Sequence, residues 1–459
     1  MNILLINPIA VRKPDFPPLG LLSVGTGLKQ NGYTVRILDA ALEGLEIPAI
    51  VERALAFRPD LIGITTFIVN ERLFLKLARE LKKSLSCPVV LGGPHSSSYP
   101  EELMKKEPAI DGVVVKEGET TTLELCRAIQ EGSDWAGIDG MVYRDRNQQI
   151  ITNPPRPIAK NMDEFPIPDR SLVSLHAYKP IPNMYTRSPS TSIITSRGCP
   201  FSCTYCFEAG VLAQRYRRRS PEKVIEEIRY LINDYGIREI AFWDDEFVLN
   251  NKWVHTFCDL MIAEKIDVTW SCFGRVGSVN PELLRHMADA GCWSISYGIE
   301  SGNQESLDFI KKECTVENIR DAVRWTHEVG IETRCSFMLA LPGETPEMGQ
   351  KTIDFAIELD VDYAQFFATN PLPGTPIYDD SLNLGTRAPD VVDYGFSRPA
   401  RAPFVPNGYR DERQILKLLK KGHRQFYFRP GYFWKHLKRV RNLESVKKYW
   451  RGVKMVLEV

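Results

Sequence analysis

The feature that most restricts the fold is the repeated alternation of short apolar segments with amphipathic helical segments. Through residue 145 the apolar segments are rich in valine, isoleucine and leucine, and helical stretches separate them. Apolar strands spaced by helices predict a parallel sheet covered on both faces, so residues 1–145 are expected to form a doubly wound, Rossmann-like α/β domain. The expected strands are NILLIN (2–7), TVRILDA (34–40), LIGITT (61–66), PVVLGG (88–93) and GVVVKEG (112–118).

Candidate ligand-binding residues follow three of these strands. Ligands of doubly wound sheets bind beyond the carboxyl ends of the strands. Paired glycines at such an end let the backbone approach a ligand closely, although a tight turn is the alternative for any one glycine. The residues at the three ends are Thr65 and Thr66, then Gly92, Gly93 and His95, and finally Glu117 and Gly118.

A proline-rich stretch, residues 146–190, separates this alternation from a second one and predicts an ordered linker. From residue 191 to residue 385 six strand–helix units follow, fewer than the eight of a closed barrel, so we expect a partial (β/α)6 barrel. Residues 386–459 are expected to form a small, basic, mainly helical region. The polar residues that follow the barrel strands are Asp244, Asp245, Glu246, Arg275, Glu300, Ser301 and Glu344.

Three cysteines in one loop, Cys199, Cys203 and Cys206, mark the start of the second alternation. Most of the other cysteines are scattered singly, which indicates packed thiols in a reducing compartment rather than a disulfide framework. Thiolates at C-x3-C-x2-C spacing converge on one metal centre, and cysteine-only ligation favours zinc or an iron–sulfur cluster. Zinc requires a fourth ligand, whereas a four-iron cluster held by three cysteines leaves one iron open.

The cysteine loop, TSRGCPFSCTYCFEAG (195–210), resembles the signature of the radical S-adenosylmethionine (SAM) enzymes, with aromatic Tyr205 and Phe207 flanking the last cysteine. The segments YGIES (297–301) and FMLALPGETPE (337–347) are similar to later strands of that superfamily. The resemblance implies that the three cysteines hold a [4Fe-4S] cluster whose open iron binds SAM. An electron from the cluster would then cleave SAM to a 5′-deoxyadenosyl radical.

The same resemblance implies a set of SAM-binding residues. Asp245 and Glu246 correspond to the motif that contacts the methionine amino group, although WDDEF lacks the glycines usual there. Glu300 and Ser301 would hold ribose hydroxyls or the carboxylate. Arg275 and Arg334 are cationic candidates for the carboxylate or a substrate anion, with a structural salt bridge as the alternative. Tyr205 completes the predicted SAM site, and no catalytic residue is assigned beyond these.

The N-terminal half resembles the cobalamin-binding domain that precedes the radical SAM domain in one large subfamily. The segments that carry the resemblance are PPLGLLSVGTGLKQNGYTVRILDA (17–40), PDLIGITT (59–66), PVVLGGPHSSSYPEE (88–102) and DGVVVKEGETTTLEL (111–125). It implies that Thr65, Thr66, Gly92, Gly93, His95, Glu117 and Gly118 line cobalamin. The loop after the first strand, residues 7–20, contains no histidine, so the lower face of cobalamin is expected to be free of a histidine ligand.

The subfamily includes methylases of unactivated carbons and the anaerobic cyclase of bacteriochlorophyll synthesis. We therefore expect a cobalamin-dependent radical SAM enzyme, a C-methyltransferase that uses the 5′-deoxyadenosyl radical and methylcobalamin. One alternative is a cyclase, oxidase or rearrangement enzyme in which cobalamin has a redox or structural role. Another is a non-catalytic cobalamin or redox sensor.

Charge and hydropathy suggest partners and location. From residue 401 onward there are 16 lysines and arginines against 4 acidic residues, so this region suits an anionic surface: a membrane face, an acidic substrate or the body of the same protein. No nucleic-acid recognition motif accompanies it. Neither a signal peptide nor a membrane span is expected, and the location predicted is cytoplasmic. The expected partners are a small or lipid-like substrate and an electron donor such as flavodoxin or ferredoxin.

Three further residues have two interpretations. Trp243 and Trp270 could shape a substrate cavity, and Cys335 could face the barrel lumen as a hydrogen donor. Core packing is the expectation for all three, because buried tryptophan and free cysteine side chains are most often packing residues.

Overall fold

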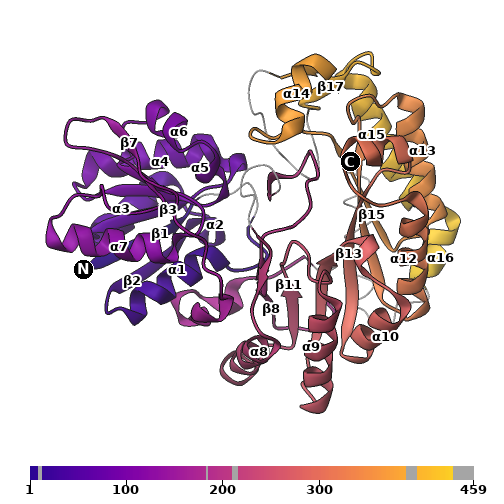
Figure 1. The fold of residues 1–459 in the computed structure, drawn as a ribbon, viewed down its shortest axis with the longest axis horizontal. Coiled ribbons are helices and arrows are strands. Elements are labelled where there is room, and N and C mark those ends of the chain that lie inside the picture. The colour runs from indigo at the N-terminus through magenta and orange to yellow at the C-terminus, as the bar shows by residue number, and fades with distance from the viewer. Residues whose placement is uncertain (9–12, 182–183, 209–214, 389–400, 438–459) are drawn as a thin grey trace. The chain divides into compact units, whose positions relative to one another are not determined.

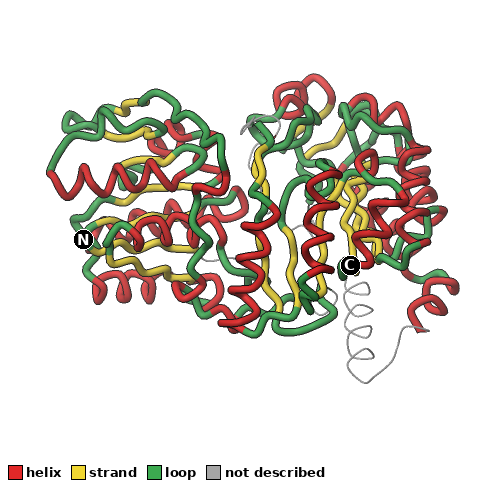
Figure 2. Tube along the Cα trace, turned by 60° about the horizontal axis from the view of Figure 1, so that its bottom comes forward, coloured by secondary structure: helices red, strands yellow, loops and turns green. Residues whose placement is uncertain are grey.

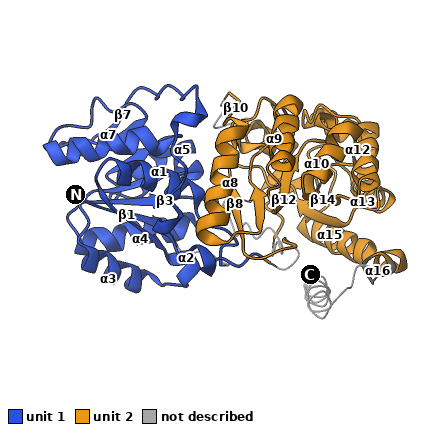
Figure 3. Cartoon of the chain, turned by 90° about the horizontal axis from the view of Figure 1, so that it is seen from below, with its two compact units in different colours: residues 1–180 blue, residues 181–459 orange. Residues whose placement is uncertain are grey.

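The computed structural model describes residues 1–8, 13–181, 184–208, 215–388 and 401–437. The chain divides into two compact units, residues 1–180 and residues 181–459 (Figure 3). Each unit is an α/β structure with its own sheet (Figure 1). The α/β fold class expected from the sequence is therefore confirmed for both units.

The described part of unit 1 contains a seven-stranded sheet in the order β2-β1-β3-β4-β5-β6-β7, of which the first five strands are parallel. The crossovers reverse direction at β1, as a doubly wound sheet requires. The strands are β1 (Asn2–Asn7), β2 (Thr34–Asp39), β3 (Leu61–Thr65), β4 (Val89–Gly92), β5 (Gly112–Val114), β6 (Met141–Arg144) and β7 (Ile150–Thr152). Its helices are α1 (Leu19–Gln30), α2 (Ala40–Glu43), α3 (Ile47–Phe57), α4 (Glu71–Ser84), α5 (Pro94–Ser98), α6 (Pro100–Lys106) and α7 (Gly118–Glu131).

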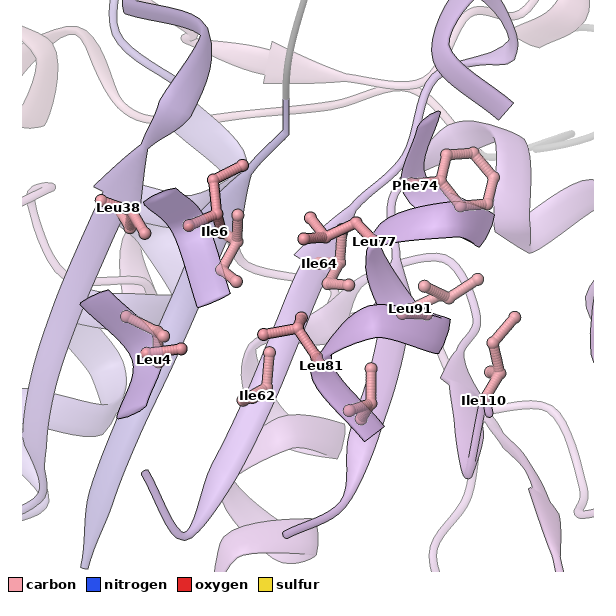
Figure 4. Close-up of a cluster of buried hydrophobic side chains, with 14 of the residues drawn as sticks. Leu4, Ile6, Leu38, Ile62, Ile64, Phe74, Leu77, Leu81, Leu91 and Ile110 are labelled. Atoms are coloured by element: carbon pink, nitrogen blue, oxygen red, sulfur yellow. The ribbon is translucent and has the colours of Figure 1, made fainter. Parts of the chain in front are cut away.

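Two apolar cores lie on opposite faces of this sheet. Alternate residues of β1 separate between them: Leu4 and Ile6 pack on one face, and Ile3 and Leu5 on the other. The first core includes α3 and α4, with Phe74 among its fully buried side chains (Figure 4). The second core is closed by α1 and α7. Burial on both faces explains why the strands read as continuous apolar runs.

The hairpin of β6 and β7 differs from the sequence-based expectation, which placed residues 146–190 in a linker. β6 pairs antiparallel with both β5 and β7, and Ile150–Thr152 therefore belongs to the sheet. The turn is closed by Asp145, whose side chain accepts hydrogen bonds from the main-chain N–H groups of Asn147 and Gln149 at 2.8 Å each. Such an Asx turn needs neither glycine nor proline.

The described part of unit 2 contains a six-stranded parallel sheet in the order β15-β14-β13-β12-β11-β8. The strands follow chain order from one edge to the other, and Figure 2 shows helices along the outside of this sheet. The expected partial (β/α)6 barrel is confirmed. The strands are β8 (Ser190–Ile193), β11 (Glu239–Phe242), β12 (Thr269–Gly274), β13 (Cys292–Glu300), β14 (Glu332–Leu339) and β15 (Tyr363–Ala368).

The remaining elements of unit 2 are helices and two short antiparallel ribbons. The helices are α8 (Pro221–Tyr235), α9 (Asn251–Ala263), α10 (Pro281–Asp289), α11 (Gln304–Phe309), α12 (Val316–Glu328), α13 (Pro346–Glu358), α14 (Pro376–Leu384), α15 (Glu412–Tyr427) and α16 (Pro430–Leu437). The ribbons pair β9 (Ser196–Arg197) with β10 (Arg217–Arg218), and β16 (Gly385–Arg387) with β17 (Phe404–Pro406).

Two of the three residues with two interpretations lie in the core of unit 2. Trp270 is fully buried between the sheet and α9, with its ring centroid 5.6 Å from that of Phe257, and Cys335 is also buried. The expectation that Trp243 packs in the core is wrong, because 43% of this residue is exposed. Trp243 directly follows β11 at its carboxyl end, where the strand leaves the packed layer.

The described part of the basic C-terminal region docks on the barrel of its own chain. The guanidinium of Arg429 donates to Asp360 at 2.8 Å, and the Lys435 ammonium lies 3.2 Å from an Asp362 carboxylate oxygen. Its helix α15 buries an apolar face that includes Phe426. Residues 438–459, which carry much of the predicted positive charge, lie outside the described residues. Within the described ranges, no helix combines the length and apolarity needed to cross a bilayer.

Candidate cofactor sites

The loop with the three cysteines is fixed by backbone hydrogen bonds. The N–H of Cys206 donates to the carbonyl of Cys203 at 3.1 Å, which makes a tight turn between two of the thiols. Thr204 anchors the middle of the loop: its N–H donates to Ile310, and its carbonyl accepts from Ile377. Cys203 is buried, and Cys199 and Cys206 are half-buried. Among the described residues no group of three ligating side chains is arranged to hold a single metal ion. Three thiols in one loop are a donor set of the kind that holds iron–sulfur clusters.

Arg275 lies against this loop with only 4% of its surface exposed. Its Nη1 donates to the sulfur of Cys203 at 3.8 Å, and its guanidinium carbon lies 3.7 Å from the centroid of the Phe201 ring. Its other terminal nitrogen, Nη2, is buried and has no hydrogen-bond partner within the described residues. A buried donor without a partner is costly, so this nitrogen is suited to an anionic ligand group.

Tyr205, Glu300 and Lys312 form a second polar cluster beside the cysteines. The Tyr205 hydroxyl donates to Glu300 Oε1 at 2.8 Å. Lys312 Nζ donates to the Tyr205 hydroxyl oxygen and to Glu300 Oε1, each at 3.0 Å. Burial lowers the pKa of Lys312, but the nearby Glu300 and Cys203 outweigh burial, and the pKa is raised. Burial and Glu300 both raise the pKa of Tyr205. The tyrosine is therefore neutral and the lysine charged, which makes the cluster an ion pair bridged by a hydroxyl.

Carboxyl groups with unsatisfied oxygens lie near the loop. Glu208 Oε2 and Glu246 Oε2 are buried and have no partner among the described residues. Burial raises the pKa of each of these two glutamates to about 7. Burial together with Asp244 raises the pKa of Asp245 to about 6, although this side chain is exposed and water would screen part of the effect. Carboxylate oxygens that lack hydrogen-bond partners in the described residues can accept hydrogen bonds from a ligand ammonium group.

Asp244 has a structural part instead. Its Oδ1 accepts from the N–H and hydroxyl of Thr195 at 2.7 and 2.9 Å, and from the N–H and hydroxyl of Ser196. These bonds join the end of β11 to the segment that leads into the cysteine loop. The side chain that the sequence places in a polar cluster thus holds the start of the loop in place.

Three other polar residues predicted near the strand ends are held in separate networks. The Ser301 hydroxyl is buried 3.2 Å from the Thr352 hydroxyl. Arg334 donates to Glu332 at 2.8 Å, and it lies five residues before the end of β14, roughly 16 Å along the strand. Glu344 is fully buried and accepts from the Tyr409 hydroxyl at 2.7 Å. The structure therefore groups Tyr205, Glu246, Arg275 and Glu300 with the cysteines, but not Arg334 or Glu344.

Lys312 is the functional candidate that the sequence did not reveal. It follows α11 in a lysine-rich turn, KKE, which reads as an ordinary solvated loop. Its burial depends on the turn folding back so that the Ile310 carbonyl reaches Thr204 in the cysteine loop. No local pattern predicts that contact.

In unit 1 the residues after β3 and β4 meet at the carboxyl edge of the sheet. The Thr66 hydroxyl donates to the Gly92 carbonyl at 2.9 Å and accepts from the Ser96 N–H at 3.0 Å. Gly93 has φ of 103°, and a Cβ there would lie 3.0 Å from main-chain atoms of Thr66. At Gly92 a Cβ would meet no atom within 4 Å, so the backbone there borders open space. A large flat ligand could approach that edge closely.

His95 and Glu117 lie differently from each other. His95 is buried, with Nε2 2.7 Å from Glu71 Oε2, and this hydrogen bond is the main reason that the pKa of Glu71 falls to about 2. Its side chain is thus directed to α4. Glu117 precedes α7 and borders a pocket that the β6–β7 hairpin and the segment 153–158 also line. Gly118 begins α7, and a Cβ there would lie 3.3 Å from Val114.

Comparison with known proteins supports both units. Residues 193–356 match the model of the Radical SAM superfamily, and residues 8–126 match that of the B12 binding domain. The chain is 35% identical over 445 residues to an uncharacterized methyltransferase of Pyrococcus horikoshii, covering 94% of this chain and 93% of the relative. It is 27% identical to the anaerobic magnesium-protoporphyrin IX monomethyl ester cyclase of Rubrivivax gelatinosus, covering 94% of this chain and 78% of that protein.

A solved structure shows the same fold. The radical SAM methyltransferase TsrM from Kitasatospora setae superposes with a TM-score of 0.73 at 22% identity, covering 94% of this chain and 84% of that one. The match covers nearly the whole chain, so the fold of both units is present in a known three-dimensional structure.

Proposed function

Because the chain belongs to the radical SAM enzymes that carry an N-terminal B12-binding domain, we propose that it is a cobalamin-dependent methyltransferase acting on an unactivated carbon. The observation that carries this proposal is the pairing of a three-cysteine loop in unit 2 with a glycine-lined strand edge in unit 1. The Pyrococcus horikoshii relative, which matches over nearly its full length, is described as an uncharacterized methyltransferase.

When bound, a [4Fe-4S] cluster and SAM supply the radical that activates the substrate carbon, and cobalamin supplies the methyl group. In this proposal Cys199, Cys203 and Cys206 hold the cluster. Three thiolates leave one iron for the amino and carboxylate groups of SAM. In this loop the protein itself orients the three thiols, through the backbone hydrogen bonds of Thr204 and Cys206.

The SAM site in this proposal combines opposite charges. Glu246 and Asp245 would accept from the methionine ammonium, and Arg275 Nη2 would donate to the carboxylate. Glu246 Oε2 and Arg275 Nη2, like Glu208 Oε2, lack hydrogen-bond partners among the described residues, and Asp245 is exposed. Glu300 contacts the ribose hydroxyls, with Tyr205 and Lys312 holding its carboxylate in place. Ser301 supports Glu300 through the backbone, and Arg334 has no part in the proposed site, because it is paired with Glu332 early in β14.

The cobalamin site in this proposal is the edge formed by Thr65, Thr66, Gly92 and Gly93, with Glu117 and Gly118 at its side. Gly92 borders open space, which a corrin or its nucleotide tail would fill. His95 acts indirectly: its bond to Glu71 fixes the turn that follows Gly93.

The domain limits proposed are residues 1–152 for the cobalamin domain, which include the β6–β7 hairpin, 153–190 for the linker, 191–385 for the radical SAM barrel and 386–459 for the basic region. The proposed partners are a small or lipid-like substrate and a flavodoxin or ferredoxin, and the proposed location is the cytoplasm. Peripheral membrane contact through the basic region belongs to the same proposal, whereas nucleic acid has no part in it.

The test uses the full chain, reconstituted anaerobically with iron, sulfide and cobalamin, and incubated with dithionite and SAM labelled in its methyl group. We expect 5′-deoxyadenosine in solution and label in the corrinoid fraction, with both lost in Cys203→Ala. Failure to form either product in protein with a full complement of iron would contradict the proposal.

Cyclisation or oxidation is a second candidate, supported by the 27% identity to the Rubrivivax cyclase. It predicts 5′-deoxyadenosine without label in the corrinoid fraction. A sensor predicts neither product, so the same incubation separates all three functions.

A further inference from the structure

We propose that Arg275 sets the reduction potential of the cluster, acting as a positioning residue through its N–H···S contact with Cys203. The inference rests on the proposed function, because it requires that Cys203 ligate a cluster. It deepens that function by assigning to Arg275 a task that is fulfilled before SAM binds.

The first observation is that the Arg275 guanidinium forms no salt bridge with a carboxylate of the described residues. Among the described residues, no Asp or Glu oxygen lies within salt-bridge distance of Arg275, although only 4% of the residue is exposed. Glu246 interacts electrostatically with Arg275, and Lys312 and Arg275 both lower the pKa of this carboxyl against the burial that raises it, but the Glu246 and Arg275 side chains form no salt bridge. A buried, unpaired cation is expensive unless a nearby anion compensates. The group to which its side chain donates is the Cys203 sulfur.

The second observation is that the guanidinium is held rigidly. The Phe201 ring, from the same loop as Cys203, lies 3.7 Å from the guanidinium carbon. A planar guanidinium stacked on a ring keeps its N–H directions fixed, which an ammonium on a flexible stem does not. The loop therefore carries both the thiolate and the surface that orients the donor toward it.

The third observation separates Arg275 from the other cation near the loop. Lys312 also interacts electrostatically with Cys203, but its Nζ lies 3.0 Å from Glu300 Oε1. The field of an ion pair falls off faster than that of a single charge, so Lys312 contributes little net charge at the cysteines. Of these two cations, Arg275 is the one that forms no salt bridge within the part of the chain that the structure describes.

Reduction of the cluster is a one-electron step. An external low-potential donor gives one electron to the cluster, whose charge becomes more negative by one, and Arg275 neither gains nor loses a proton or an electron. Net charge and hydrogen bonds to the sulfurs are among the factors that set cluster potentials. A fixed cation at a ligand sulfur favours the reduced form, so loss of Arg275 should move the potential to more negative values.

The experiment is a redox titration of the reconstituted full chain without SAM, monitored by the electron paramagnetic resonance of the reduced cluster, with dithionite and low-potential mediators. Arg275→Gln should lower the ratio of reduced to oxidised cluster about tenfold at a fixed potential, a shift of about 59 mV for one electron. Arg275→Lys, which retains the charge but not the fixed N–H direction, should lower the ratio by about threefold, less than Arg275→Gln does. Arg320→Gln removes a half-buried arginine paired with Glu358 and should leave the potential unchanged.

Phe201→Leu provides a second variant that removes no charge. Without the ring the guanidinium loses its fixed direction. We expect the ratio of reduced to oxidised cluster at a fixed potential to fall about threefold. If Arg275→Gln does not take up a full complement of iron, Phe201→Leu decides: an unchanged potential would overturn the inference.

Two outcomes distinguish this inference from the function on which it rests. If Arg275→Gln weakens SAM binding but leaves the SAM-free potential of a fully loaded cluster unchanged, Arg275 serves only as a SAM ligand and the inference is wrong. If the unmodified chain takes up no [4Fe-4S] cluster, the proposed function fails first, and the inference falls with it.

Discussion

The conformation of Glu300 decides what its side chain can reach. β13 bulges between Gly298 and Glu300, and Glu300 has φ of 67°. A non-glycine residue in this region is strained and persists only where its surroundings hold it. Tyr205 and Lys312 hold it, since both bond the same carboxylate oxygen. The strain therefore coincides with the polar cluster proposed to bind SAM.

Gly298 is required by that cluster. A Cβ at this position would lie 2.5 Å from Glu300 Oε1 and 3.0 Å from Lys312 Nζ. Gly298→Ala should displace the ion pair and lower the free energy of unfolding by about 1–3 kcal/mol, measured by urea denaturation. Gly431→Ala is the matched control, because a Cβ there meets nothing within 4 Å. Equal stability of the two variants would contradict this description of the cluster.

Glu344 predicts a pH dependence of stability. Burial raises its pKa from 4.5 to about 7, so the folded protein binds a proton there that the unfolded chain releases. Stability is then lost as pH rises from about 4.5 to about 7, by at most about 3 kcal/mol. Glu344→Gln should reduce this loss in urea titrations at pH 5 and pH 8. Glu347→Gln, an exposed neighbour, should not, and an identical pH profile for wild type and Glu344→Gln would refute the assignment.

Single residues near the site were predictable to different degrees. Position after a strand was enough to select Arg275, Glu246 and Glu300, because parallel strands bring their carboxyl ends to one edge. It failed for Arg334, which lies early in β14. It also missed Lys312, whose burial depends on a turn contacting a loop over 100 residues away.

Helices and strands with a strong hydrophobic pattern were predicted well, whereas the β6–β7 hairpin was not. The five parallel strands of unit 1 are continuous apolar runs, which buried strands require. β6 and β7 have only four and three residues, and β7 is half-buried or exposed throughout. Short edge strands carry little hydrophobic pattern, and the turn between them is made by Asp145 rather than by glycine. The proline-rich composition that follows then suggested a linker.

Helix α15 binds the C-terminal region to the barrel through one apolar face. Phe426 is fully buried, with its ring centroid 6.4 Å from that of Phe366 in β15. Phe426→Ala should lower the free energy of unfolding by about 3–5 kcal/mol, seen as a lower midpoint in urea. Phe428→Ala, two residues along and 41% exposed, should lower it by less. A reversed order would show that α15 does not pack as described.

At the scale of the whole molecule, each unit has the core of an independent domain. Unit 1 has apolar clusters on both faces of its sheet, and Tyr178, near its end, donates to Asp39 at 2.6 Å. Its last residues are thus tied to the carboxyl edge of β2. The alternation of strands and helices predicted both sheets, whereas the docking of α15 and α16 needed the structure, because amphipathic helices show an apolar face but not its partner.

A fragment of residues 1–180 should therefore fold alone. We expect a single cooperative thermal transition by circular dichroism and retention of cobalamin, seen in the visible spectrum after gel filtration. Gly93→Val should release cobalamin, because a side chain there would collide with the main chain of Thr66. A fragment without a cooperative transition would show that unit 1 depends on unit 2.

If three cysteines leave one iron free for SAM, electron–nuclear double resonance of the reduced, reconstituted enzyme will detect SAM at the cluster. With SAM carrying ¹⁵N in its amino group, we expect a nitrogen hyperfine coupling to the cluster that changes between ¹⁴N and ¹⁵N. A spectrum of fully loaded cluster that is identical with and without SAM would contradict it.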